Sequence, residues 1–300
     1  MDAKTLLFAG LGIVLVVYAA AIVRGGLAVP TVLQTAIGFV TAFFDTLGIG
    51  SFATTTAVYK LRRMVPVELM PGTLNVGHAL ATIAQAFIYT SIVPVDPTTL
   101  VLMIIAACIG SWLGAGVVVH WPRRKIQIGM GIALMGAAVL MLMTQLDLFP
   151  KGGDTLDLTG MRLGVGLAGN FVLGALMMLG IGLYAPCTIL IYLLGMNPTA
   201  AFPIMMGSCA FLMPIASVRF VKTRTYHVQA ALGLALGGLP AALIAGLIVK
   251  SMSVTAVRWL VVVVVIYTSI NMLVTAQGQD ERDGPEGLDG REGGVAKVNA

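Results

Sequence analysis

The sequence Leu-Gly-Ile-Gly interrupts an apolar run at residues 47–50 and returns in a second apolar run at residues 179–182. One offset of 132 residues aligns both segments and continues without a gap on either side. The residues matched at this offset include Phe39 with Phe171, Thr56 with Thr188, Pro66 with Pro198 and Pro71 with Pro203. Self-similarity at a fixed offset indicates a duplicated structural unit. The sequence therefore predicts two membrane repeats, at residues 28–145 and 163–276, each starting with a helix broken by Gly-Ile-Gly.

The amino-acid composition is that of a membrane protein. Hydrophobic residues make up 58% of the 300 residues and charged residues only 10%, whereas a soluble domain has about 25% charged residues. This excludes a water-soluble enzyme, and we expect neither enzymatic activity nor a cofactor. Cys108, Cys187 and Cys209 lie inside apolar runs, where we expect them to serve packing. The cations lie in short loops between apolar runs, so their expected partner is membrane lipid and not nucleic acid.

Apolar stretches fill most of the chain, and charge-free stretches of 18 or more residues are candidates to cross a bilayer as helices. We therefore expect an all-α, polytopic membrane protein. The predicted helices are Leu6–Val23, Ala28–Leu47, Ser51–Tyr59, Pro71–Val93, Leu100–Val119, Ile126–Thr144, Leu163–Leu179, Leu183–Leu194, Ala200–Val218, Val228–Val249 and Trp259–Ala276. Residues 1–27 then hold an additional N-terminal transmembrane helix, residues 146–162 a polar loop between the repeats, and residues 277–300 a charged tail that we expect to be disordered.

The two broken segments decide the predicted topology. If each doubles back as a re-entrant hairpin, every repeat has three full crossings, and the odd number inverts the second repeat relative to the first. About seven crossings result, with ten loop cations on one side of the membrane and five on the other. If the broken segments span, nine crossings result and the split is nine against six. Because positive charge marks the cytoplasmic side, we prefer inverted repeats with the N-terminus outside. The nine-crossing arrangement stays as an alternative, since Ala28–Leu47 as a helix would be about 30 Å long.

Both breaks predict a binding site for a small anion. Gly-x-Gly frees backbone groups that hydrocarbon cannot satisfy, and the half-helix after each break begins with N–H groups that lack intrahelical acceptors and carry partial positive charge. Nearby hydroxyls are further donors to an oxyanion. The predicted substrate-binding residues are Gly48, Gly50, Ser51, Thr54, Thr55 and Asn75 in the first repeat and Gly180, Gly182, Tyr184, Cys187 and Thr188 in the second. The alternative is that the glycines allow close helix packing and the hydroxyls bond to carbonyls of their own helices.

Asp45 and His78 are the predicted proton-coupling residues. Asp45 is a carboxylate inside an apolar run, three residues before Gly48, and this position is costly unless the group is protonated, paired or hydrated. The alternative for Asp45 is a neutral acid that caps the break. His78 shares one interior face of the next predicted helix with Asn75 and Gln85, and a lone membrane histidine is also a common hydrogen-bond partner between helices. No metal-ligand spacing occurs in the sequence, so we expect no metal.

Small residues also predict close contacts between helices. Two of the predicted helices contain several glycines, namely Gly110, Gly114, Gly129 and Gly136. Such residues let helix backbones approach each other. They fit packing within one chain and contacts in a homodimer equally well.

The duplicated glycine motif resembles the TauE/SafE family of sulfite exporters, also called the toluenesulfonate uptake permease group. Each half of that family has an apolar helix, a Gly-Ile-Gly-Gly-Gly turn, a second apolar stretch and a proline-led loop before a Gly-Thr-Ser-like segment. The similar segments here are residues 39–77, with Pro71-Gly72-Thr73, and residues 171–209, with Gly207-Ser208. The chain departs from the pattern at Ser51-Phe52 and Leu183-Tyr184, where the family has further glycines. The resemblance implies transport of sulfite, sulfonates or related organic sulfur anions across the inner membrane.

Together these features predict a secondary transporter of a small organic sulfur or carboxylate anion that works by alternating access, with a proton on Asp45. A passive anion channel on the same scaffold is the first alternative. An integral-membrane enzyme or assembly scaffold is the second.

Overall fold

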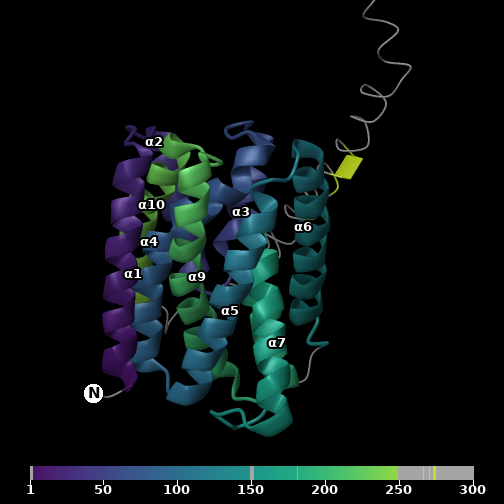
Figure 1. Ribbon diagram of the computed structural model, residues 1–300. Helices are drawn as coiled ribbons and strands as arrows, with labels where there is room; N and C mark the ends of the chain where they lie inside the picture. The colour runs from purple at the N-terminus through teal and green to yellow at the C-terminus, as the bar shows by residue number, and fades with distance from the viewer. Residues whose placement is uncertain are drawn as a thin grey trace, which may run out of the picture.

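The computed structural model describes residues 3–148, 152–180 and 182–248, together with residues 266, 270, 273 and 274. This part of the chain consists of helices joined by short loops (Figure 1). The α-helices are α1 (Ala3–Gly25), α2 (Val32–Thr46), α3 (Ser51–Leu61), α4 (Met70–Ile92), α5 (Pro97–Val118), α6 (Arg123–Gln145), α7 (Gly160–Met177), α8 (Tyr184–Leu193), α9 (Ala201–Thr223) and α10 (Val228–Ile248). The 3-10 helices η1 (Val67–Leu69) and η2 (Pro198–Ala200) directly precede α4 and α9. Most of the predicted helix at residues 259–276 and the tail at residues 277–300 lie outside the described residues.

Within the described part of the chain, six helices are long and apolar enough to cross a membrane. They are Thr5–Gly25, Pro97–Val118, Arg123–Gln145, Gly160–Met177, Pro198–Thr223 and Val228–Leu247. These helices confirm the prediction of an all-α, multi-pass membrane protein. α4 has the same length as α6, 23 residues, but it buries polar side chains, among them Asn75, His78 and Gln85.

α2 and α3 form a hairpin whose two open ends lie at the same end of the helix bundle. Before α2, the carbonyl of Val29 accepts a hydrogen bond of 2.8 Å from Gln229 Nε2. Near the end of α3, the Tyr59 hydroxyl donates to the Ala230 carbonyl at 3.5 Å. Both bonds reach the first turn of α10. The chain therefore enters and leaves this hairpin on one side.

The predicted helix Ala28–Leu47 is wrong at its beginning. The helix starts only at Val32, because the Thr31 side chain and the Gln34 side chain form a capping box that satisfies free N–H groups at the helix start. With 15 residues, α2 is about 22 Å long. A bilayer core of about 30 Å needs a longer helix, so the length argument for a spanning α2 disappears.

α7 and α8 form a second hairpin, which also opens at one end. Just before α7, Leu158 N–H donates to Thr99 Oγ1 at 3.0 Å. Just after α8, Asn197 N–H donates to the Thr155 carbonyl at 2.8 Å. These residues lie beside the beginning of α5. α7 begins at Gly160, inside the predicted inter-repeat loop at residues 146–162.

α4 connects the open ends of the two hairpins. Near its beginning, Thr73 Oγ1 accepts a hydrogen bond of 2.9 Å from His227 N–H, just before α10. Beyond its end, Asp96 N–H donates to the Leu156 carbonyl at 3.0 Å, in the segment that leads into α7. The two hairpins thus enter the bundle from opposite ends, and α3 and α7 occupy opposite halves of it in Figure 1.

The hairpins are held by close contacts with long helices. α2 packs along α10, α7 packs along α5, and α4 packs against α9. A Cβ on Gly110 of α5 would lie 1.9 Å from the Phe171 carbonyl oxygen on α7, and a Cβ on Gly237 of α10 would lie 2.0 Å from the Thr35 carbonyl oxygen on α2. These helix pairs approach at backbone distance because the glycines have no side chain.

The predicted small residues therefore act differently from one another. Gly114, like Gly110, faces α7, since its Cβ would lie 2.6 Å from the Ala175 carbonyl oxygen. Gly129 faces the side chains of Leu179 and Trp121. A Cβ on Gly136 would meet nothing within 4 Å among the described residues.

Charge is distributed unevenly between the two ends of the bundle. The end where the first hairpin opens carries the cations that lie near the C-terminal ends of α1, α3 and α9, directly after α3 and α9, or at the beginning of α6, and an ion pair of 3.6 Å joins Arg123 to Glu68 there. These cations are Arg24, Lys60, Arg62, Arg63, Arg123, Arg124, Lys125, Arg219, Lys222 and Arg224. Among the residues whose side chains the structure describes, the opposite end carries Asp96, Asp147, Asp154 and Asp157, with Arg162. We refer to them as the basic end and the acidic end.

Candidate functional site

Glycine backbone geometry breaks both hairpins at their tips. Gly48, Gly50 and Gly180 have φ angles of +85°, +90° and +85°. Glycine adopts this left-handed region without the steric cost that a Cβ would bring. α2 and α7 end just before these residues, and α3 and α8 begin just after them. The predicted break at each Gly-Ile-Gly segment is confirmed.

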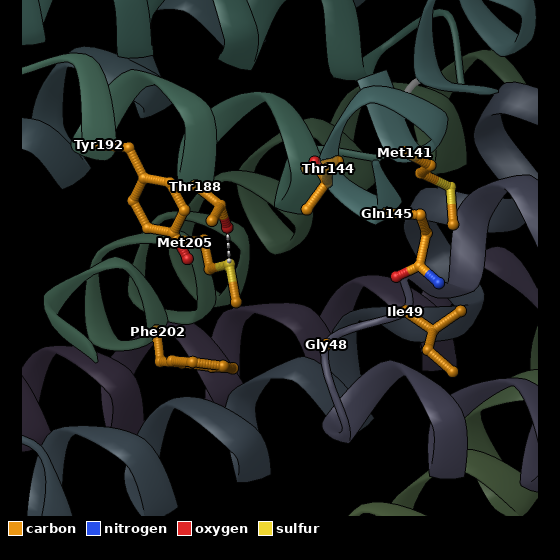
Figure 2. A pocket seen from close by; sticks show the side chains of 10 residues that line it. Gly48, Ile49, Met141, Thr144, Gln145, Thr188, Tyr192, Phe202 and Met205 are labelled. Carbon is orange, nitrogen blue, oxygen red and sulfur yellow. Dashed lines mark hydrogen bonds between the residues drawn. The ribbon is translucent and has the colours of Figure 1, made fainter. Parts of the chain in front are cut away.

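A cavity of about 130 Å³ lies between the first hairpin tip and α8 (Figure 2). The described residues that line it are all uncharged: Gly48, Ile49, Met141, Thr144, Gln145, Ala185, Thr188, Tyr192, Phe202 and Met205. Ala185 is the second residue of α8, so the N-terminal end of this helix borders the cavity. Helix N–H groups at this position have no intrahelical acceptor and attract negative charge.

The beginning of α3 differs from that of α8 because a carboxylate of the chain already occupies it. Ser51 N–H, the first of α3, donates a hydrogen bond to Asp45 Oδ1. Asp45 is 1% exposed and Ser51 is 2% exposed. Asp45 therefore caps the break, as in the alternative interpretation, and it holds the place where we expected a substrate anion to contact α3.

The other carboxylate oxygen of Asp45 joins α2 to α4 and α8. Asp45 Oδ2 lies 3.0 Å from Gln85 Nε2 and 3.0 Å from the Tyr184 hydroxyl. Gln85 Nε2 also donates to Thr46 Oγ1 at 2.9 Å, and Gln85 Oε1 lies 2.9 Å from the Tyr184 hydroxyl. The Met206 sulfur is 2.9 Å from the same hydroxyl. Asp45 and Tyr184, both predicted as site residues, thus meet across the two hairpins.

His78 belongs to a second polar cluster, between α3 and α4. Its Nε2 lies 2.9 Å from Thr55 Oγ1, so two predicted site residues contact each other here. Asn75 Nδ2 donates to the Pro71 carbonyl of its own helix at 2.9 Å. His78 Nδ1, Asn75 Oδ1 and Thr56 Oγ1 are buried and have no hydrogen-bond partner among the described residues.

The remaining predicted residues divide into two groups. Thr188 lines the cavity and donates to the Met205 sulfur at 3.6 Å. Gly182 lies beside the first hairpin, since its Cβ would be 3.8 Å from the Phe52 Cβ. These two residues therefore lie where the hairpins approach each other.

The second group does not border the cavity in the described part of the chain. The Thr54 hydroxyl lies 2.9 Å from the Ser51 carbonyl and 3.2 Å from the Gly50 carbonyl, which is the alternative of back-bonding to its own helix. Gly180 faces the Met130 side chain, and Cys187 is fully buried.

The contributions of α6 and α9 were not predicted. Thr144 and Gln145 end α6 and line the cavity, together with Phe202 and Met205 of α9. Phe202 also stacks on Tyr89 of α4, with ring centroids 5.0 Å apart. No local pattern marks these residues, because each of them looks like an ordinary helix residue until the helices are packed.

The arrangement can hold an anion that also has an apolar part. The hydroxyls of Thr144, Thr188 and Tyr192 and the Gln145 amide can supply hydrogen bonds, the N-terminal end of α8 supplies partial positive charge, and methionine and aromatic side chains supply apolar contact. Among the described residues, no group of three or more His, Cys, Asp and Glu is placed to hold a metal ion. No protein-family model, no curated protein and no solved structure matches this chain. Fold and site together define a multi-pass, all-helical membrane protein with a polar centre between two hairpins.

Proposed function

We propose that this protein is a secondary transporter that carries a small anion across the bacterial inner membrane by alternating access. The observation that carries the proposal is the uncharged cavity at the beginning of α8, next to the point where two hairpins from opposite ends meet. Broken helices at the membrane midplane typically form transporter sites, and their N-terminal ends attract anions without a fixed cation. The resemblance to the TauE/SafE family favours sulfite, a sulfonate or a related organic sulfur or carboxylate anion as the substrate.

The order of the helices supports two inverted repeats. The first residues of η1, α4 and α5 precede those of η2, α9 and α10 by 131 residues in each case. The packing partners are exchanged between the two repeats. α2 of the first repeat contacts α10 of the second, and α7, the equivalent of α2, contacts α5, the equivalent of α10. In two inverted repeats, a two-fold axis between α4 and α9 would relate these contacts. The equivalent of α6 would fall in the predicted helix at residues 259–276, most of which lies outside the described residues.

The two hairpins favour the topology with about seven crossings. In this topology α1, α4, α5, α6, α9, α10 and the predicted helix at residues 259–276 cross the membrane, and α7 is re-entrant despite its apolar length. The basic end then faces the cytoplasm. The cavity is lined by the end of α6 and the beginning of α9, so in this topology it lies between the hairpin tips and the outer side.

Uptake by purified protein in proteoliposomes tests the function. We expect saturable uptake of a sulfonate or sulfite that proceeds against its gradient when a proton gradient is imposed. Flux that never exceeds equilibrium would indicate a passive anion channel instead. Chemical conversion of the anion would indicate an integral-membrane enzyme, and absence of both flux and conversion for all anions tested would favour a scaffold.

A substitution that fills the cavity tests the location of the site. Ala185→Leu adds a side chain where α8 borders the cavity, and we expect the KM for the anion to rise at least tenfold. Ala20→Leu makes the same chemical change on an exposed position of α1 and serves as the matched control. Unchanged KM in Ala185→Leu would place the anion elsewhere.

A further inference from the structure

Three side chains at the hairpin junction contact one another in a closed triangle. The contacts are Asp45 Oδ2 to Gln85 Nε2 at 3.0 Å, Gln85 Oε1 to the Tyr184 hydroxyl at 2.9 Å, and the Tyr184 hydroxyl to Asp45 Oδ2 at 3.0 Å. Asp45 is 1%, Gln85 0% and Tyr184 5% exposed. Burial makes each contact between two oxygens costly unless a hydrogen lies between them.

The hydrogens available in this triangle can be counted. If Asp45 is ionised, the Gln85 amide supplies one hydrogen to Asp45 and the Tyr184 hydroxyl supplies its single hydrogen either to Asp45 or to Gln85. One oxygen–oxygen contact of 2.9 or 3.0 Å is then left without a hydrogen. The Met206 sulfur, 2.9 Å from the same hydroxyl, is an acceptor and adds none.

The opposite orientation of the Gln85 amide does not remove the shortage. In that orientation Gln85 donates to Tyr184 and Tyr184 donates to Asp45, but Gln85 Oε1 then lies 3.0 Å from Asp45 Oδ2 with no hydrogen between them. The Thr46 hydroxyl cannot help, because it donates to the Ala42 carbonyl at 2.9 Å. Both orientations need one more hydrogen.

We propose that this hydrogen is a proton on Asp45, and that Tyr184 and Gln85 are positioning residues which tie α8 to α4 only while Asp45 is protonated. The neutral carboxyl donates to the Tyr184 hydroxyl, which donates to Gln85 Oε1, while Gln85 Nε2 donates to Asp45 Oδ2. Loss of the proton to water turns the Tyr184 hydrogen toward the carboxylate and leaves Gln85 Oε1 without a donor. The tie between α8 and α4 is then lost.

In the described part of the chain, no charged side chain on the helices around Asp45 forms an ion pair with it. Tyr89 on α4, Tyr184 on α8 and Cys209 on α9 face it. α10, which packs along α2, has no titratable residue, and the titratable residues of α3 lie in its last turn. Among the described residues, Asp45 therefore has no cationic partner. The Ser51 N–H favours the ionised form, whereas burial among neutral side chains favours the protonated form.

The role of this proton site in coupling rests on the transport function proposed above, but its presence can be measured without transport. Infrared spectra of the full chain in lipid nanodiscs at neutral pH should contain the C=O stretching band of a protonated carboxyl group. Labelling of the aspartate carboxyl carbon with ¹³C should shift this band in the unaltered protein. The other described aspartates lie at the acidic end, outside the helix bundle core.

Three variants complete the measurement. Asp45→Asn should remove the band, whereas Asp96→Asn, a change at the acidic end, should leave it. Tyr184→Phe should retain the band but shift its frequency, because the neutral carboxyl loses its hydrogen-bond acceptor. The proposal is overturned if the unaltered protein shows no label-sensitive band at neutral pH, or if Tyr184→Phe leaves the frequency unchanged. Failure of uptake with the band present would instead overturn the transport function alone.

Discussion

A disulfide between the hairpin tips would show whether the tips must separate during transport. A Cβ on Gly182 would lie 3.8 Å from the Phe52 Cβ, close to the mean Cβ–Cβ separation of about 3.8 Å in disulfides. Gly182 does not have a positive φ, so a cysteine fits its backbone without strain. We expect the double variant Phe52→Cys/Gly182→Cys to form this bond under mild oxidation.

The size of the effect follows from the positions of the two residues. The bond closes a loop of about 130 residues, which corresponds to roughly 5 kcal/mol of stabilisation in the chain-entropy description. Loss of the Phe52 ring cancels when the oxidised and reduced forms of the same variant are compared. Thermal unfolding should therefore occur at a clearly higher temperature in the oxidised form. Uptake should fall in proportion to the cross-linked fraction and return after reduction.

Gel mobility after alkylation measures the cross-linked fraction, and proteoliposome uptake measures transport. The single variants Phe52→Cys and Gly182→Cys control for bonds to Cys108, Cys187 or Cys209. A folded double variant that forms no disulfide would show that the hairpin tips are not in contact. Full uptake by fully cross-linked protein would refute the reasoning that the tips separate.

Three further predictions concern single side chains. Gly110→Ala should lower stability by about 1–3 kcal/mol through overpacking, because its Cβ would meet the Phe171 carbonyl oxygen at 1.9 Å. The control Gly136→Ala should be neutral or stabilising, because its Cβ would meet nothing within 4 Å among the described residues. Thermal unfolding measures both effects. Gly50→Ala should cost about 1–2 kcal/mol, since φ is +90° while its Cβ would have open space; an equal unfolding temperature to the unaltered protein would contradict the left-handed tip. Uptake should decrease as pH rises through the ionisation of Asp45, and Asp45→Asn should remove this dependence; a retained pH dependence in initial rates would place the coupling proton elsewhere.

The breaks in the helices could be predicted because they have a local cause. Each Gly-Ile-Gly segment contains two glycines, which can adopt positive φ angles because they have no Cβ. Gly48, Gly50 and Gly180 have such φ angles. The long apolar stretches were predictable for a similar reason, since hydrocarbon requires runs of apolar residues whatever the partner helices are. Helix starts were less predictable, as the capping box at Thr31 and Gln34 shows.

The individual site residues were only partly predictable. Asp45 was recognisable as a costly buried charge, and Tyr184 from its place after the second break. Their contact could not be predicted, because 139 residues separate them along the chain. Gln145 and Met205 at the cavity carry no local signal at all, since neither breaks a helix nor adds charge to an apolar run.

The sequence by itself determined that this protein is an all-helical membrane protein with two glycine-broken helices, because composition and glycine content act locally on each segment. Only the tertiary structure decided that the hairpins enter from opposite ends, that a carboxylate of the chain caps α3, and that α8 borders the cavity. These features depend on which helices pack together across more than 100 residues. Side-chain distances of about 3 Å between distant segments are set by that packing and not by any local pattern.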